Sequence, residues 1–454
     1  MKGCIVEWAK LRLRVQTPLF TQGWSGGGGV TVRARGVRGA LGFWLRAVIG
    51  ARVGNDLGRL AEYQRAVFGG TACQSPVLIR VVDESLLPEA TYPPWLFKRP
   101  GAAQGPIYGM LYLLGQGLAD RRDGLKRDAV QPGSEFTVAL RLPPDGLARD
   151  LVWASLWCAR WFGGLGARAR RGYGRFEIVN VDCLIPPWFE QRPQWDSVAD
   201  GVGGVGLPVQ LKELVDGIRL GEPALLDAVP QYPRFGHDGD TNRWASARQL
   251  DVRAGSESFK SWDRCLSHLG REWQLFRRDR DMGSPQRQTS EWLRTVNGSA
   301  GSFPLGVLGL PVVFTDAVAS KEAGSAVTVT VDLIDKMGEP LRLASPMWLT
   351  ALDDAEGQWR AQTLTFVHDL CPAGAAPGVK DLARARGWSG LDPHVLRASH
   401  RAWLSVGQTR PLPVSGGAGV AGSGAGGASQ GGRDGPVVPD DLEEDADGVA
   451  PGGG

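Results

Sequence analysis

The sequence lacks the features that build disulfide frameworks, metal sites and membrane spans. Its six cysteines lie far apart without a CxxC pair, which argues against a zinc ribbon and fits a reducing compartment. No apolar run approaches the roughly 20 residues of a membrane span. The N-terminal residues include Glu7 and Lys10, where a signal peptide needs an apolar core. We therefore expect a cytoplasmic protein with no cofactor, no metal and no membrane partner.

Lysine is scarce and arginine abundant, with 9 lysines and 42 arginines in 454 residues. Residues 413–454 are glycine-rich, lack aromatics and hold one arginine and seven acids, so we expect a disordered acidic tail. Without that tail the net charge rises from +3 to +9. A basic body suits a polyanionic partner such as nucleic acid, although a charge of this size also serves solubility.

Apolar periodicity predicts an α+β fold in the first half of the chain. The pattern indicates a strand, a helix, several further strands, a second helix and a last strand. This β-α-β-β-α-β order is typical of a ferredoxin-like sheet covered by helices. The predicted strands are 7–16, 77–82, 107–114, 135–142 and 175–183, and the predicted helices are 37–48, with Gly50 or Gly54 as its stop, and 147–162.

The second half predicts another α+β domain. A long helix over 259–280 carries Trp262, Trp273 and Phe276, which we place in the core rather than at a subunit contact. Proline and glycine after residue 186 indicate a boundary, so we expect domains at 1–187 and 188–412 followed by the tail at 413–454. The remaining predicted elements are strands at 306–314, 326–334, 341–350 and 362–367 and helices at 379–386 and 394–404.

The glycine–arginine loop, residues 163–174, is the clearest functional signal. Glycines allow close approach of another backbone, and successive exposed N–H groups with arginine forks suit a phosphodiester strand. The loop leads into a strand, so it is neither a Walker A loop nor a dinucleotide fingerprint. A tight turn with solvated arginines is the alternative. The candidate RNA contacts are Gly163, Gly164, Gly166, Arg168, Arg170, Arg171, Gly172 and Gly174.

A second arginine cluster lies on the predicted helix that follows a glycine-rich stretch. One face places Val37, Leu41 and Trp44 toward the core, with Trp44 more consistent with packing than with base stacking. The helix N-terminus adds partial positive charge. The alternative is an ordinary amphipathic helix with a solvated face. The candidate contacts are Arg33, Arg35, Arg38 and Arg46.

Four segments in order resemble one protein family. TPLF (17–20) before GVRGALGFWLRAV (36–48), and the loop GGLGARARRGYG, resemble the RAMP superfamily of CRISPR-associated proteins. They are most similar to the first Cmr-series subunit of type III-B effectors. LGLPVVF (308–314) and RLASPMWL (342–349) resemble the second half of that family.

The resemblance implies two ferredoxin-like (RRM-like) RAMP domains in a ribonucleoprotein. Such a subunit would contact the CRISPR guide RNA, help capture complementary target RNA in antiviral defence, and have other Cmr-type effector subunits as partners. The family's target-cutting subunit is a different one, so the resemblance implies a non-catalytic protein. The glycine–arginine loop and the Arg38–Arg46 face carry over as RNA contacts.

Two other functions remain open. A metal-independent endoribonuclease that processes CRISPR RNA needs an acid and a base, and all five histidines lie in the second half, away from the loop in sequence. The best candidate is His237, beside Tyr232 and Asp238, which we interpret rather as an RNA contact or a solvated loop residue. A basic scaffold that binds acidic proteins is the other alternative.

Overall fold

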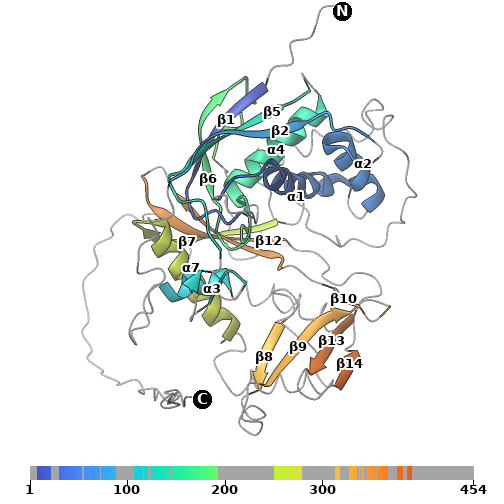
Figure 1. Cartoon of the computed structure of the whole chain (residues 1–454), viewed down its shortest axis with the longest axis vertical. Helices are drawn as coiled ribbons and strands as arrows, with labels where there is room; N and C mark the ends of the chain where they lie inside the picture. The colour runs from blue at the N-terminus through green and yellow to red at the C-terminus, as the bar shows by residue number, and fades with distance from the viewer. Residues whose placement is uncertain are drawn as a thin grey trace, which may run out of the picture. The chain divides into compact units, whose positions relative to one another are not determined.

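The computed structural model describes most of the first half of the chain and parts of the second. It is a mixed α+β structure with antiparallel sheets (Figure 1). Among these residues no helix is long and apolar enough to cross a membrane. The described ranges, with short gaps inside several of them, are 8–21, 30–53, 56–87, 107–143, 146–192, 250–278, 312–316, 327–366 and 376–390.

A four-stranded sheet organises the first half. Its order is β2-β5-β1-β6, and every neighbouring pair is antiparallel. Along β1 the side chains alternate, and Leu11, Leu13 and Val15 are buried. The expected strands near residues 7–16, 77–82, 135–142 and 175–183 are therefore confirmed. Their bounds are β1 Trp8–Val15, β2 Leu78–Ser85, β5 Glu135–Arg141 and β6 Phe176–Asp182.

Helices α1 (Ala34–Val53) and α4 (Leu147–Phe162) share one hydrophobic core with this sheet (Figure 1). Trp44 of α1 is 2% exposed, so its predicted core position is confirmed. Gly50 does not end α1, because its position is buried inside the helix, and Gly54 lies outside the described residues. The prediction for α4 agrees with the structure at both ends.

Helix α2 (Leu57–Phe68) was not predicted. Asp56 caps its N-terminus by accepting a hydrogen bond from the Arg59 N–H, and Gly69 follows its last residue. The helix buries Leu60, Tyr63 and Val67 and packs against α1. It therefore covers part of the α1 face that carries arginines.

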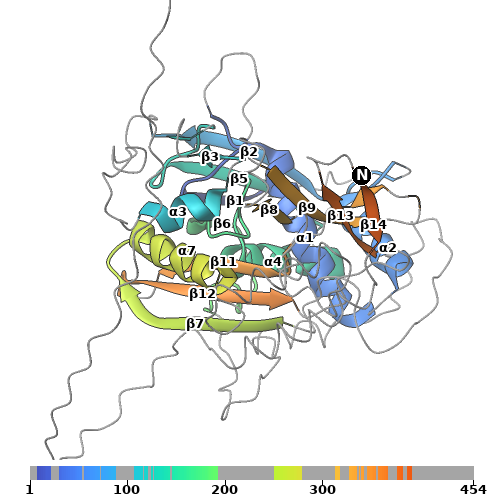
Figure 2. The ribbon, with the colours of Figure 1, turned by 90° about the horizontal axis from the view of Figure 1, so that it is seen from below.

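The predicted strand over 107–114 is wrong, because these residues form helix α3 (Ile107–Leu114). A short apolar run does not distinguish a buried strand from a buried helix. The deciding contact is long-range: α3 lies against α7 (Trp262–Arg278), with Gly109 and Gly270 at the crossing (Figure 2). A Cβ at either glycine would overlap the other helix's backbone. Two two-residue strands follow α3, β3 (Ala119–Asp120) and β4 (Gly124–Leu125).

Helix α7 confirms the long helix predicted in the second half. It packs against β11 and β12 of a three-stranded sheet of order β11-β12-β7 (Figure 2). Its Trp273 is buried, as expected, while Trp262 is half-buried. Strand β12 agrees with the prediction, β11 begins later than predicted, and β7 was missed. The bounds are β7 Leu250–Phe259, β11 Met347–Asp353 and β12 Trp359–Phe366.

A further antiparallel sheet has the order β10-β9-β13-β14, with β8 also paired to β9. The helix predicted over 379–386 is wrong, because this region supplies parts of β13 and β14. Pairing of β13 with six residues of β9 overrides the helical pattern of the local sequence. The helix predicted over 394–404 and the tail lie outside the described residues. The bounds are β8 Val312–Asp316, β9 Val327–Ile334, β10 Pro340–Leu341, β13 Ala376–Asp381 and β14 Arg386–Gly390.

Candidate nucleic-acid interface

The glycine–arginine loop connects α4 to β6 and is fastened by the end of β1. The Thr17 hydroxyl donates to the Gly172 carbonyl and accepts from the Arg175 N–H, both at 2.9 Å. The Pro18 carbonyl accepts from the Gly174 N–H at 2.9 Å. The segment TPLF therefore positions the far end of the loop across about 155 residues of sequence.

Aromatic side chains hold the loop on its other side. The Phe20 carbonyl accepts from the Ala167 N–H at 2.7 Å, and the Phe20 and Tyr173 rings meet edge to face at 5.5 Å. The Tyr173 hydroxyl donates to the Met110 carbonyl of α3 at 2.9 Å. The loop thus contacts both the first sheet and the α3–α7 pair.

Positive φ angles account for three of the loop glycines, Gly166, Gly172 and Gly174. Gly174 has φ +70°, and an added Cβ would overlap the Leu165 carbonyl oxygen. The two ends of the loop are joined by a backbone hydrogen bond, in which the Leu165 N–H donates to the Gly174 carbonyl at 2.8 Å. The chain is therefore close-packed at Gly174 in addition to having a positive φ there. Only glycine meets both conditions here.

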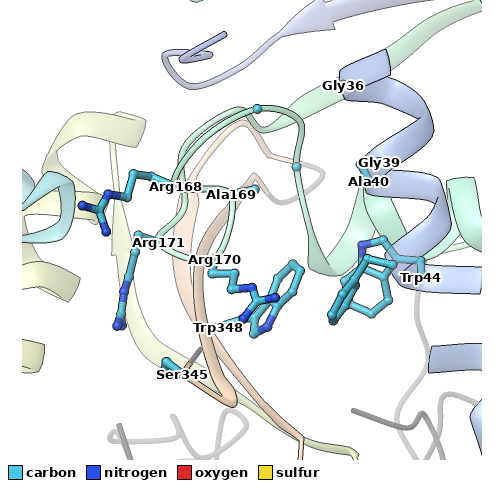
Figure 3. Close-up of a pocket in the computed structure, with 13 residues that line it drawn as sticks. Gly36, Gly39, Ala40, Trp44, Arg168, Ala169, Arg170, Arg171, Ser345 and Trp348 are labelled. Atoms are coloured by element: carbon cyan, nitrogen blue, oxygen red, sulfur yellow. The ribbon is translucent and has the colours of Figure 1, made fainter. Parts of the chain in front are cut away.

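The three arginines of the loop point to three different places (Figure 3). Arg168 has a positive φ of 62°, which costs an L-residue about 1–3 kcal/mol. Its guanidinium lies near Gly115 and Gly117, just after α3. A cation there faces the negative end of the α3 dipole. Arg168 therefore serves the packing of α3.

Arg171 contacts the second half of the chain. Its guanidinium lies over the Trp273 ring of α7, 4.8 Å from the centroid. Its backbone pairs with Leu349, whose N–H donates to the Arg170 carbonyl at 3.0 Å. The loop thereby extends the edge of β11.

Arg170 lies over two aromatic rings at the opposite side of the loop. Its guanidinium is 5.3 Å from the Phe43 centroid and 5.2 Å from the Trp348 centroid. Burial lowers the pKa of Arg170, and the nearby charge of Arg46 lowers it further. Within the described part of the chain, the Arg170 guanidinium makes no hydrogen bond or ion pair.

An open pocket of about 570 Å³ lies between α1 and the glycine–arginine loop (Figure 3). None of the four arginines predicted near α1 is among its described lining residues. Its walls come from α1, the glycine–arginine loop and the start of β11. Among the described residues that line it there is no Asp or Glu. The lining residues are Gly36, Gly39, Ala40, Phe43, Trp44, Gly164, Gly166, Arg168, Ala169, Arg170, Arg171, Ser345 and Trp348.

The α1 arginines divide in a way that the sequence did not indicate. Arg33 and Arg35 are exposed at the start of α1. Arg38 donates to the Phe68 carbonyl of α2 and lies 5.9 Å from the Phe68 centroid. Arg46 donates to the Gln64 amide oxygen at 3.2 Å, and burial lowers its pKa. The expected solvated arginine face is therefore partly engaged by α2.

Arg175 was missed as a residue that supports the site. It is 2% exposed, and its guanidinium donates to the Arg160 and Gly163 carbonyls at the C-terminus of α4. Burial is the main cause that lowers its pKa to about 10. The cation caps α4 where the loop begins. Nothing in the sequence separates it from the surface arginines beside it.

Of the remaining expectations, the loop glycines lie where they were predicted, with Gly163 and Gly164 packed tightly beside Trp44 and Gly174. Phe43 and Trp348 are the contributions that sequence reasoning missed, although both lie in segments that carried the family resemblance. His237 lies outside the described residues. Among the described side chains, no three His, Cys, Asp or Glu residues are arranged to hold a metal ion.

Comparison with known proteins bears on the segment that contains the loop. The RAMP superfamily matches residues 12–177, from β1 to the first residues of β6. This segment of the chain is similar to that superfamily. The resemblance drawn from the glycine–arginine loop and the TPLF segment is confirmed.

Two proteins of Pyrococcus furiosus are similar to parts of this chain. The CRISPR system Cmr subunit Cmr1-1 is 32% identical over 154 residues, which cover 34% of this chain and 42% of that protein. The subunit Cmr1-2 is 27% identical over 178 residues, 37% of this chain and 92% of that protein. The match to Cmr1-1 thus spans less than half of its length. These matches confirm the resemblance to the first Cmr-series subunit.

Two solved structures also resemble the chain. Apo Cmr1 from Pyrococcus furiosus is 17% identical, with 87% of this chain and 96% of that chain covered and a TM-score of 0.47. A chain of the type III-B Cmr-beta complex bound to cognate target RNA is 11% identical, with 88% and 99% covered and a TM-score of 0.41. The resemblance to Cmr-series proteins rests on the sequence matches.

Proposed function

We propose that this protein is a non-catalytic, RNA-binding subunit of a type III-B (Cmr) CRISPR ribonucleoprotein effector. In that role it contacts guide RNA and helps to capture complementary target RNA. The observation that carries the proposal is the pocket between α1, the glycine–arginine loop and β11. Its lining includes Arg170 and two aromatic rings and, among the described residues, no acid; the charge of Arg46, which is not part of the lining, acts on Arg170.

The electrostatics of the pocket favour a polyanion. Burial lowers the pKa of both Arg170 and Arg46, and the charge of Arg46 lowers the pKa of Arg170 further. An anion beside Arg170 would favour its protonated form. Gly36 and Gly39 of α1 leave room for a strand to approach, because an added Cβ at either would meet no atom within 4 Å. Arginine forks and aromatic surfaces are the contacts that single-stranded RNA uses.

The fold proposal follows the same family. We assign the sheet β2-β5-β1-β6, with its two helical crossovers, to a ferredoxin-like RAMP domain at 1–187. We assign residues 188–412 to a second α+β RAMP-like domain, followed by the tail at 413–454. Helix α3 belongs to the first domain in sequence and packs on α7 of the second.

The test is binding of the full chain to a fluorescent single-stranded RNA across a salt series. Arg170→Ala with Arg46→Ala should weaken binding at least about tenfold, because a hydrogen bond to a charged group contributes about 1.5–3 kcal/mol. If each arginine neutralises one phosphate, the slope of log affinity against log salt should fall by about 1.4.

Arg52→Ala is the matched control. It removes an exposed arginine from the same helix, about 24 Å from Gly36 at 1.5 Å per residue. Its affinity should stay near that of the wild type. Equal losses in both variants, or no binding at low salt, would contradict a specific RNA site. RNA that is cut during the assay would instead support the endoribonuclease alternative.

The assembly part of the proposal has its own readout. Tagged full chain purified from its native cells should bring down a particle that contains other Cmr-type subunits and short guide RNAs. Recovery of the chain free of RNA and of such subunits would contradict it and would favour the scaffold alternative.

A further inference from the structure

Arg170 lines the pocket with its guanidinium over two aromatic rings, an arrangement that is unusual for an arginine that binds phosphate. Phe43 and Trp348 touch each other, with ring centroids 4.7 Å apart and planes 33° apart. No ligand ring fits between them. The Arg170 guanidinium lies over both rings at once and, like them, lines the pocket.

Packing, rather than an ion pair, fixes this guanidinium. Trp348 is 5% exposed and is itself held by Trp44 at 5.1 Å and Phe366 at 6.1 Å. The Arg170 carbonyl accepts a hydrogen bond from β11, so the backbone beneath the side chain is anchored as well. The planar cation is therefore held in place before any ligand arrives, which lowers the entropic cost of binding.

A guanidinium with one face on aromatic rings can offer its other face to a ligand. Nucleobases stack on arginine planes as they do on aromatic side chains. A flexible arginine that is free in solvent would instead reach for phosphate with its edges. The volume of about 570 Å³ falls within the range of pockets that enclose small ligands.

We propose that Arg170 is a stacking platform for an unpaired nucleobase, backed by Phe43 and Trp348. The proposal rests on the RNA-binding function proposed above and adds which part of the RNA this site takes. The site then selects single-stranded over double-stranded RNA, because a paired base cannot leave its stack to reach the platform.

The experiment compares two RNAs of equal length and charge, one ordinary and one with abasic sugars throughout. Arg170→Lys keeps the charge and removes the plane. It should weaken binding of the ordinary RNA about tenfold and leave binding of the abasic RNA within about twofold. Wild type should prefer the ordinary RNA by a similar factor, since stacking is sequence-tolerant but needs a base.

A second readout does not depend on affinity. An RNA with 2-aminopurine in place of adenine should lose fluorescence when bound to wild type or to Arg52→Lys, and lose much less when saturated with Arg170→Lys. Thermal unfolding of each variant checks that it folds.

The outcomes separate the two proposals. Equal weakening of both RNAs by Arg170→Lys would make Arg170 a phosphate contact and overturn the stacking role, while RNA binding would stand. Failure of wild type to bind either RNA would overturn the RNA-binding function itself. Equal affinity of wild type for the ordinary RNA and its duplex would also contradict the platform.

Discussion

The two sides of the glycine–arginine loop use the same residue type for different ends. On one side Arg168 and Arg171 lie against α3 and α7, where they join the two halves of the chain. On the other side Arg170 lies against Phe43 and Trp348. All three arginines border the open pocket, but only Arg170 lies over the two rings that line it. What an arginine does here depends on what the fold places opposite it, which a charge count does not reveal.

The largest effect on stability should come from the backbone turn at Gly174, which closes the glycine–arginine loop and is shared by both of its sides. Gly174→Ala forces a side chain into positive φ and into the Leu165 carbonyl, so we expect a loss of about 3 kcal/mol from strain and overpacking. Thermal unfolding of the full chain measures it. Gly39→Ala is the control: it is exposed in α1 with no atom within 4 Å of the new Cβ. It should gain up to about 1 kcal/mol. Similar unfolding midpoints for Gly174→Ala and Gly39→Ala would show that the turn at Gly174 tolerates a side chain.

A smaller effect should distinguish Arg171, on the α7 side of the loop, from Arg170, on the side of Phe43 and Trp348. Arg171→Ala loses the contact with Trp273 and should destabilise the chain by about 0.5–2 kcal/mol. Arg170→Ala also loses ring contacts but removes a partly buried cation close to Arg46, so its stability should change less. Its RNA affinity should fall more than that of Arg171→Ala. Unfolding midpoints and RNA titrations of both variants test this, and the reverse order in both assays would refute the division.

The smallest effect lies on the first sheet, apart from both sides of the loop. Hydrogen bonds from Arg12 and then Arg14 lower the pKa of Glu135. A carboxyl group whose pKa is lower in the folded than in the unfolded chain stabilises the folded state at neutral pH. This stabilisation is lost as the pH falls from the unfolded-state pKa through the lower folded-state pKa. Glu135→Gln should therefore narrow the drop in unfolding midpoint between pH 7 and pH 3. Asp182→Asn on β6 removes the same charge as a control, and an equal narrowing there would point to net charge alone.

Elements with a strong local pattern were predictable from the sequence. Helix α4 has apolar residues on nearly every face and was placed at both ends, and the alternation in β1 was clear. Where the local pattern was short or ambiguous, long-range packing determined the secondary structure. Residues 107–114, predicted as a strand, form helix α3 against α7, and the region predicted as a helix over 379–386 contributes to strand β13, which pairs with β9. Helix α2 had a visible cap at Asp56 that was not recognised.

The candidate site was predictable in its parts but not in its assembly. The loop and α1 were each singled out as candidate RNA contacts, with Arg170 among them, but nothing in the sequence indicated that they border the same pocket. The division of labour among Arg168, Arg170 and Arg171 follows from α3, α7 and β11, which are far away in sequence. Arg175 shows the same limit, because its burial depends on the α4 C-terminus above it.

The residues that line the pocket are far apart in the sequence, and this has a consequence for the order in which the ribosome makes them. Trp348 is made 177 residues after Arg171, a delay of roughly 10–35 s at about 5–20 residues per second. Until then Phe43 and Trp44 lack the rings of Trp348 and Phe366 that cover them. The nascent first half of the chain therefore carries an uncovered aromatic surface on the ribosome, and the pocket is not complete before Trp348 has been translated.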